Sequence, residues 1–153
     1  MQNKNITDFD PSCFTSDKQR DLYSYWLKIK ADHQFPSRED FNPTDIPHVL
    51  SVIWMADVVD EGNELKFDIR LVGTDIAHAF QQQSANVPLD ILTFSDPIIE
   101  RLTALVKTRK PYYYQGDFPI ENTDYNYYST ISLPFSTDDE NVDIIISCVH
   151  CFS

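Results

Sequence analysis

The turn "RLVGT" at residues 70–74 is the first stretch of the chain whose residue types could do chemistry. A loop that holds a phosphate needs several converging backbone N–H groups, and it usually contains several glycines and a lysine. This turn contains one glycine, Gly73, and no lysine. We therefore expect Gly73 to let the chain change direction, through a positive φ or a close backbone approach. Thr74 or Asp75 is expected to cap the short helix that follows.

A second group combines two carboxylates and one guanidinium on neighbouring strands. In a hairpin with its tip at Gly62 and Asn63, Asp57 lies opposite Asp68, and Arg70 lies diagonal to Asp57. Facing carboxylates repel each other unless a cation lies between them, and Arg70 can supply that cation. The cluster could sense an anion or act in acid–base chemistry, but ion pairs that only fix a hairpin are the favoured interpretation.

Cys148, His150 and Cys151 carry thiols and an imidazole, which are groups that bind zinc. A structural zinc site needs four ligands, commonly from two such clusters, and this chain has one cluster. In a strand, Cys148 and His150 point to one face and Cys151 to the other, which prevents joint chelation. We therefore expect ordinary strand cysteines and assign no metal site. We also assign no catalytic residue, because the G-x-S-x-G and H-E-x-x-H motifs of hydrolases are absent from the sequence.

Tyrosines are concentrated in two consecutive strand patterns, which hold six of the eight in the chain. Aromatic cross-strand pairs stabilise sheets. The functional alternative is a half-exposed aromatic face for self-association. Stacking on nucleic-acid bases is disfavoured, as is an anionic membrane, because 24 acidic residues against 12 basic ones give a net charge of −12. The six residues are Tyr112, Tyr113, Tyr114, Tyr125, Tyr127 and Tyr128.

The length of 153 residues fits one domain, which we place at residues 17–153 behind a flexible N-terminal arm at residues 1–16. The N-terminus lacks the apolar run of a secretory signal, and no later stretch is apolar enough to span a bilayer. Three cysteines, an odd number without an export signal, favour reduced thiols and a cytoplasmic location.

Hydrophobic periodicity predicts three helices and five strands. An apolar stripe with Trp26 near its centre indicates a helix over residues 17–31. A short helix follows Gly73, and the clearest helix covers residues 95–111, with Asp96 as its N-cap. Alternating patterns predict strands at residues 51–59, 64–72, 112–120, 125–135 and 142–152. Strands joined by short turns predict an antiparallel sheet with helices on one face, an α+β architecture.

The hairpin register predicts which residues share a face of this sheet. One face is wholly apolar and comprises Val52, Trp54, Ala56, Val58, Leu65, Phe67, Ile69 and Leu71. The other face comprises Ile53, Met55, Asp57, Val59, Lys66, Asp68, Arg70 and Val72.

Three stretches of this chain resemble a PAS domain, and more closely a family of mostly stand-alone bacterial PAS-like proteins. They are "LYSYWLKIKADHQFPSREDFNPTDIPHVLSVIWMADVV", "FDIRLVGTDI" and "ISLPFSTDDENVDIII", and together they cover about residues 20–150. The resemblance implies a five-stranded antiparallel sheet in the order 2-1-5-4-3, with helices on one face and a flanking N-terminal helix. It also implies sensing or signal transduction, often as a homodimer.

The stretch "QQQSANVPLDIL" departs from this family, whose members usually have a glycine soon after the short helix. No residue resembles a haem ligand or the reactive cysteine of flavin-binding PAS domains, so the cofactor is left unknown.

These observations predict a non-catalytic PAS-type sensory or small-molecule-binding domain that acts through dimerisation or a partner protein, without nucleic acid or membrane. Its ligand is expected between the sheet and the helices. The candidate ligand-binding residues are Trp54, Phe67, Ile69, Arg70, Phe80, Tyr127 and Ser129. The alternatives are a self-association or protein-interaction module with a closed core, and a small isomerase-like α+β enzyme with Asp57 as its best base.

Overall fold

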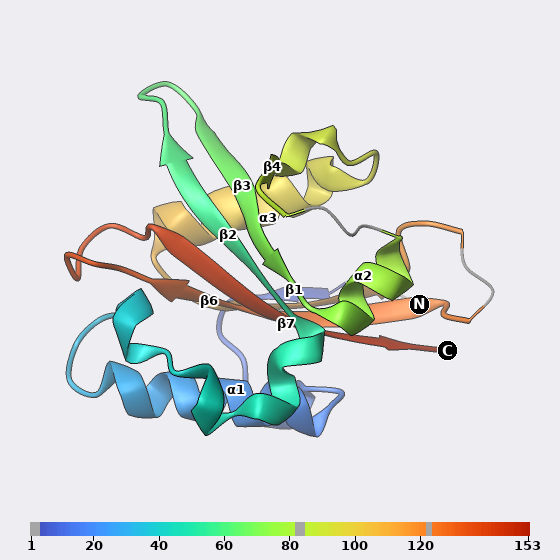
Figure 1. The fold of residues 1–153 in the computed structure, drawn as a ribbon, viewed down its shortest axis with the longest axis horizontal. Helices are drawn as coiled ribbons and strands as arrows, with labels where there is room; N and C mark the ends of the chain where they lie inside the picture. The colour runs from blue at the N-terminus through green and yellow to red at the C-terminus, as the bar shows by residue number, and fades with distance from the viewer. Residues whose placement is uncertain (1–3, 82–84, 122–123) are drawn as a thin grey trace.

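The computed structural model describes residues 4–81, 85–121 and 124–153, and an antiparallel sheet runs through its centre (Figure 1). The described residues form seven strands in the spatial order β1-β5-β6-β7-β2-β3-β4. The strands are β1 Lys4–Ile6, β2 Ile53–Asp60, β3 Leu65–Val72, β4 Val87–Pro88, β5 Tyr112–Asp117, β6 Tyr127–Phe135 and β7 Ile144–Phe152.

The helices are α1 Asp17–Lys30, α2 Thr74–Phe80 and α3 Ser95–Thr108, together with short 3₁₀ turns. These turns are η1 Pro11–Cys13, η2 Arg38–Asp40, η3 Pro43–Asp45, η4 Pro47–Val52 and η5 Leu89–Ile91. None of the helices in the described ranges combines the length and the apolar character that crossing a bilayer requires.

The predicted count of five strands is wrong because two short strands extend the sheet at its edges, so the order of the whole sheet differs from 2-1-5-4-3. β1 pairs with β5, and β4 pairs with β3. The five longer strands are arranged β5-β6-β7-β2-β3. The edge strands have three and two residues, too few to show an alternating pattern, and β4 includes a proline, which is tolerated at a sheet edge.

Helices cover both faces of the sheet, not one face as the sequence indicates. On one face, Leu22 and Trp26 of α1 pack against Ile53 of β2 and Ile146 of β7. On the other, Leu102 and other α3 residues pack against the sheet beside η5. Figure 1 shows α1 and α3 on opposite sides of the sheet. The flanking N-terminal helix, α1, is thus one of three layers: α1, the sheet, and α3 with η5.

The N-terminal segment before α1 lies against this sheet. β1 pairs with β5, and Thr15 Oγ1 lies 2.6 Å from both Ser129 Oγ and His150 Nδ1. The expectation of a flexible arm at residues 1–16 concerns mobility and stays a prediction; residues 1–3 lie outside the described ranges.

The ends of the helices follow local capping rules. Ser16 caps α1 by accepting a hydrogen bond from the backbone N–H of Gln19. In α3, the predicted N-cap Asp96 is instead the second helical residue, and Phe94 holds the cap position without a side-chain hydrogen bond. An acidic residue in the first turn still favours the helix dipole, which explains why the sequence pattern placed the cap two residues late.

The β2–β3 hairpin has the predicted register near its tip and a different one farther away. Asp57 pairs with Asp68, and Gly62 has a φ of +86°, as the first residue of a type II′ turn requires. The register shifts between Met55 and Ala56, so that Val72 pairs with Trp54. Val72 therefore joins the face predicted for Leu71, and Leu71 is 39% exposed. An irregularity of this kind exchanges the two faces of one strand beyond the point where it occurs.

Gly73 is required for a close backbone approach, and its φ of −63° is open to any residue. Its N–H donates to the Ile53 carbonyl at 2.7 Å. A Cβ at this position would lie 2.5 Å from the Ser51 carbonyl oxygen and 2.6 Å from that of Leu50. The backbone of η4 thus packs directly on the corner between β3 and α2.

We predict that Gly73→Ala lowers the free energy of unfolding by about 1–3 kcal/mol, because the new methyl group meets backbone that cannot rotate away. Urea denaturation measures this loss. Gly62→Ala is the matched control, since nothing lies within 4 Å of a Cβ there. It should cost about 1 kcal/mol through its positive φ alone. Equal stability of Gly73→Ala and the wild type would contradict the close approach.

Candidate functional site

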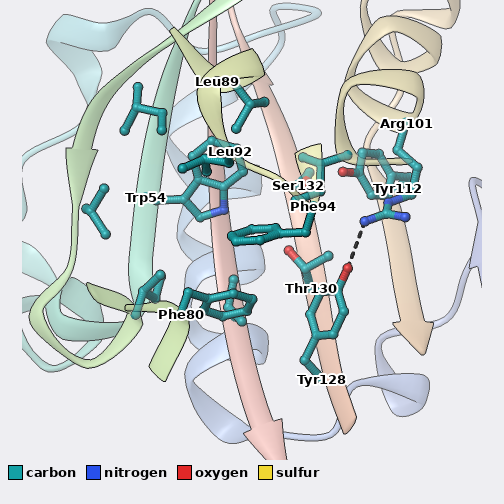
Figure 2. A pocket seen from close by; sticks show the side chains of 15 residues that line it. Trp54, Phe80, Leu89, Leu92, Phe94, Arg101, Tyr112, Tyr128, Thr130 and Ser132 are labelled. Atoms are coloured by element: carbon teal, nitrogen blue, oxygen red, sulfur yellow. Dashed lines mark hydrogen bonds between the residues drawn. The ribbon is translucent and has the colours of Figure 1, made fainter. Parts of the chain in front are cut away.

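A cavity lies between the sheet and the layer formed by α2, η5 and α3 (Figure 2). The volume open to the centre of a water molecule is about 60 Å³. Since one water needs roughly 10–15 Å³ on this measure, the space corresponds to about four to six waters. Small-molecule sites commonly have this form, with apolar walls and a few convergent polar groups.

Aromatic and aliphatic side chains make up most of the cavity wall. Trp54 and Ile69 come from the β2–β3 hairpin, and Phe80 comes from the last turn of α2. The Phe80 ring lies 5.8 Å from the ring of Phe94 and meets the ring of Tyr128 edge to face at 5.9 Å. These contacts hold the end of α2 against the sheet and give that side of the cavity a fixed shape.

The polar side of the cavity is organised around Arg101 of α3. Its Nη2 donates a hydrogen bond to the Tyr128 hydroxyl at 2.8 Å, which Figure 2 marks with a dashed line. Its guanidinium carbon lies 3.7 Å from the centre of the Tyr114 ring, the geometry of a cation–π contact. Thr130 and Ser132 line the same side, and Ser132 Oγ lies 2.6 Å from Ser147 Oγ.

Two polar atoms at this cavity have no hydrogen-bond partner. They are Arg101 Nε and Thr130 Oγ1. Arg101 is 8% exposed and Thr130 is 5% exposed, so both side chains are largely removed from bulk solvent. Within the described part of the chain, Arg101 forms no ion pair with a carboxylate. A buried cation is costly unless an anion or several acceptors surround it, so this is the most unusual feature of the site.

The two tyrosines beside Arg101 keep their protons at neutral pH. Burial raises the pKa of Tyr128 far above its usual value, and the nearby guanidinium opposes this only in part. Burial also raises the pKa of Tyr112. The Tyr128 hydroxyl accepts from Arg101 and still carries a proton of its own to donate.

Three of the seven predicted site residues line the cavity: Trp54, Ile69 and Phe80. Phe67 is buried in the same core beside η5 but does not line it. Arg70 is on the opposite face of the hairpin, where its Nη1 lies 3.0 Å from Asp57 Oδ1. This ion pair is the structural role that the sequence favoured for the cluster.

The remaining two predicted residues, Tyr127 and Ser129, are not among those that line the cavity; their neighbours Tyr128 and Thr130 are. Ser129 Oγ instead accepts a hydrogen bond from Gln19 Nε2 of α1, on the other face of the sheet. Strand residues alternate between the faces, and β6 is buried on both, so its sequence shows no apolar–polar alternation. Tyr127 and Ser129 thus alternate along β6 with the residues that line the cavity.

Sequence reasoning missed Arg101, although a signal was present. The predicted stripe of α3 contains Ile98, Leu102 and Leu105, and Arg101 falls three residues after Ile98 and four before Leu105. An arginine on the apolar stripe of an amphipathic helix must be buried or displaced. The position of Arg101 on this stripe therefore indicates a candidate functional residue.

The C-terminal cysteines and histidine alternate between the faces, as the strand pattern predicts. Cys148 packs in the core beneath α1, and Cys151 packs with the α2 side. Burial raises the pKa of Cys148 to about 12 and that of Cys151 to about 11, so both thiols are unreactive at neutral pH. No group of three metal-binding side chains occurs among the residues that the structure describes.

A family model of the PAS domain matches residues 14–149 of the chain. No curated protein matches the chain.

We predict that Tyr128→Phe lowers the free energy of unfolding by about 1–3 kcal/mol, because it removes the acceptor of a buried guanidinium N–H. Chemical denaturation provides the measurement. Tyr127→Phe, one residue away and outside the cavity, is the control and should stay within about 0.5 kcal/mol of the wild type. Equal effects of the two substitutions would show that the Arg101–Tyr128 bond contributes nothing.

The environment of His150 predicts a pH dependence of stability. Burial lowers the pKa of His150, so the unfolded chain binds a proton more readily than the folded one. Stability should therefore fall as the pH decreases from 7.5 through 6.5, the ordinary histidine pKa, towards 5.5. His150→Gln should show a shallower fall in urea denaturation midpoints. The other three histidines are present in both proteins, so their contributions to the pH dependence of stability cancel in the comparison. Parallel curves for the two proteins would contradict this assignment.

Proposed function

The chain belongs to the PAS domain family, and from that premise we propose that it is a non-catalytic sensory domain that binds a small molecule between its sheet and α3. The observation that carries the proposal is the cavity, which combines apolar walls with hydrogen-bonding groups that the protein leaves unpaired. The family suggests a sensory or ligand-binding role, and a fully packed core would offer no room for one.

The composition of the cavity supports binding without catalysis. No aspartate, glutamate, histidine or cysteine is found among the described residues that line it. Hydroxyl nucleophiles such as those of Thr130 and Ser132 need an adjacent general base, and the described lining offers none of the carboxylates or imidazoles that most often serve as one. Asp57, the best base for an isomerase-like enzyme, is paired with Arg70 and does not line the cavity. The isomerase-like alternative therefore has little support.

The alternative of a self-association module with a closed core is also less well supported. Leu22 and Trp26, on the apolar stripe of α1, are buried against the domain's own sheet. Of the tyrosines proposed for an exposed face, Tyr112, Tyr113 and Tyr128 are buried. These side chains stabilise the monomer and offer no apolar surface to a second molecule.

We propose that occupancy of the cavity is communicated through dimerisation or a partner protein. The bound molecule would contact α2 and α3, which form the outer wall of the cavity, so their packing would depend on it. We also place the protein in a reducing compartment such as the cytoplasm. The three free thiols, Cys13, Cys148 and Cys151, support this.

Native mass spectrometry of the protein purified from its host tests the binding function. We predict a bound small molecule that is lost on denaturation. Val149→Phe should remove it, because the larger ring would occupy the cavity that Val149 lines. Val59→Phe is the control, since Val59 is on the hairpin outside the cavity. The proposal fails if no adduct is retained and no added small molecule binds more tightly to the wild type than to Val149→Phe.

A further inference from the structure

We propose that the ligand of this cavity is a small organic acid, whose carboxylate is bound by Arg101, Tyr128 and Thr130 and whose apolar part lies against Trp54, Phe80 and Phe94. This inference rests on the binding function proposed above and names the chemical class of the ligand. Figure 2 shows the three polar residues on one side of the cavity, across from Trp54.

The first argument is the charge of Arg101. Arginine stays protonated in proteins, so α3 brings a full positive charge into an apolar cavity. Its neighbours, the Tyr128 and Tyr112 side chains and the Tyr114 ring, are neutral, and Nε has no hydrogen-bond partner. A carboxylate would supply both the missing charge and acceptors that match the planar guanidinium.

The second argument is that the neighbouring groups are donors. Thr130 Oγ1 is buried and unpartnered, and it lies two residues from Tyr128 on the same face of β6. The Tyr128 hydroxyl already accepts from Arg101, so its own proton is available to a ligand. A guanidinium and two hydroxyls that lack acceptors are complementary to an anion and not to a cation.

The third argument concerns which anion fits. The described lining has one cation and no acidic side chain, so a single negative charge balances it. A phosphate dianion would leave one charge uncompensated in a largely apolar site. The net charge of −12 on the whole chain disfavours anions elsewhere on the surface, so binding of an acid would report on this cavity. The volume of about 60 Å³, room for about four to six waters, favours a small acid.

The experiment compares acids with their neutral amides. The probes are butanoate, hexanoate and benzoate, each against the corresponding amide, with inorganic phosphate as a second anion. Isothermal titration calorimetry gives the affinities, and the same samples are checked for thermal shifts. We expect at least one acid to bind at least tenfold more tightly than its amide, as charge-assisted hydrogen bonds predict.

Two variants and a control test which residues make the cavity select acids over amides. Arg101→Met keeps an unbranched side chain without the charge. The ratio of the affinity for an acid to that for its amide should then fall to about one. Thr130→Val removes one donor at nearly constant volume and should weaken the acid about tenfold. Arg70→Met removes a surface arginine that is paired with Asp57, and it should leave the ratio unchanged. Circular dichroism confirms that each variant is folded, and Thr130→Val provides the test if Arg101→Met is not.

The outcomes separate this inference from the binding function on which it rests. Amides that bind as well as acids, a preference for phosphate, or a ratio that persists in the folded variants would each overturn the carboxylate assignment while leaving a ligand-binding domain. If none of the probes binds, the molecule retained in native mass spectrometry decides: a carboxylate supports the inference, and a ligand without one overturns it. A cavity that holds only water overturns both proposals.

Discussion

The burial of β6 and β7 on both faces is the constraint on which the rest of the structure depends. Covered strands cannot leave polar groups to solvent, so each side chain has to be satisfied within its own layer. Towards α1, Ile131 and Leu133 of β6 pack in a largely apolar core. Towards α3, Tyr128, Thr130 and Ser132 alternate with them and surround a space that the protein leaves partly empty. Because successive side chains point to opposite faces, β6 contributes both to the core beneath α1 and to the wall of the cavity.

Beneath α1, several buried polar groups form hydrogen bonds within the protein. Gln19 of α1 is fully buried and donates to both Ser129 Oγ and the Cys148 carbonyl, and the Trp26 indole donates to the Pro134 carbonyl at 2.9 Å. Such satisfied polar contacts specify how α1 lies on the sheet. By comparison, a cavity of about 60 Å³ costs on the order of 1 kcal/mol. The domain can tolerate this cost, and a ligand that fills the space would offset it.

The main elements of the fold could be predicted because their patterns are local. The stripe around Trp26 predicts α1, and the tight turn at Gly62 predicts the register of the hairpin near its tip. The edge strand β4 could not be predicted, since two residues show no period and pairing depends on the neighbouring strand. The register shift beside Met55 could not be predicted from the sequence either, because both Leu71 and Val72 are apolar and either could face the core.

The candidate site was harder to predict than the fold for a related reason. Tyr128, Thr130 and Ser132 come from β6, whose two faces look alike in sequence. Tyr128 and Thr130 could therefore be distinguished from Tyr127 and Ser129 only by tertiary contacts. Arg101 differs, because its place on the apolar stripe of α3 was visible without a structure. A charged residue at a core position contradicts the local pattern, and such contradictions tend to mark functional sites.

The packing at Gly73 connects the two layers. α2 forms one wall of the cavity and begins at Gly73, whose backbone touches the carbonyls of Leu50 and Ser51 in η4. Leu50 in turn packs against the core beneath α1. Because this contact is between backbones, a displacement of α2 by a ligand cannot be absorbed there by side-chain rotation. The corner at Gly73 thus places the α2 wall of the cavity next to η4, which itself packs against the core beneath α1.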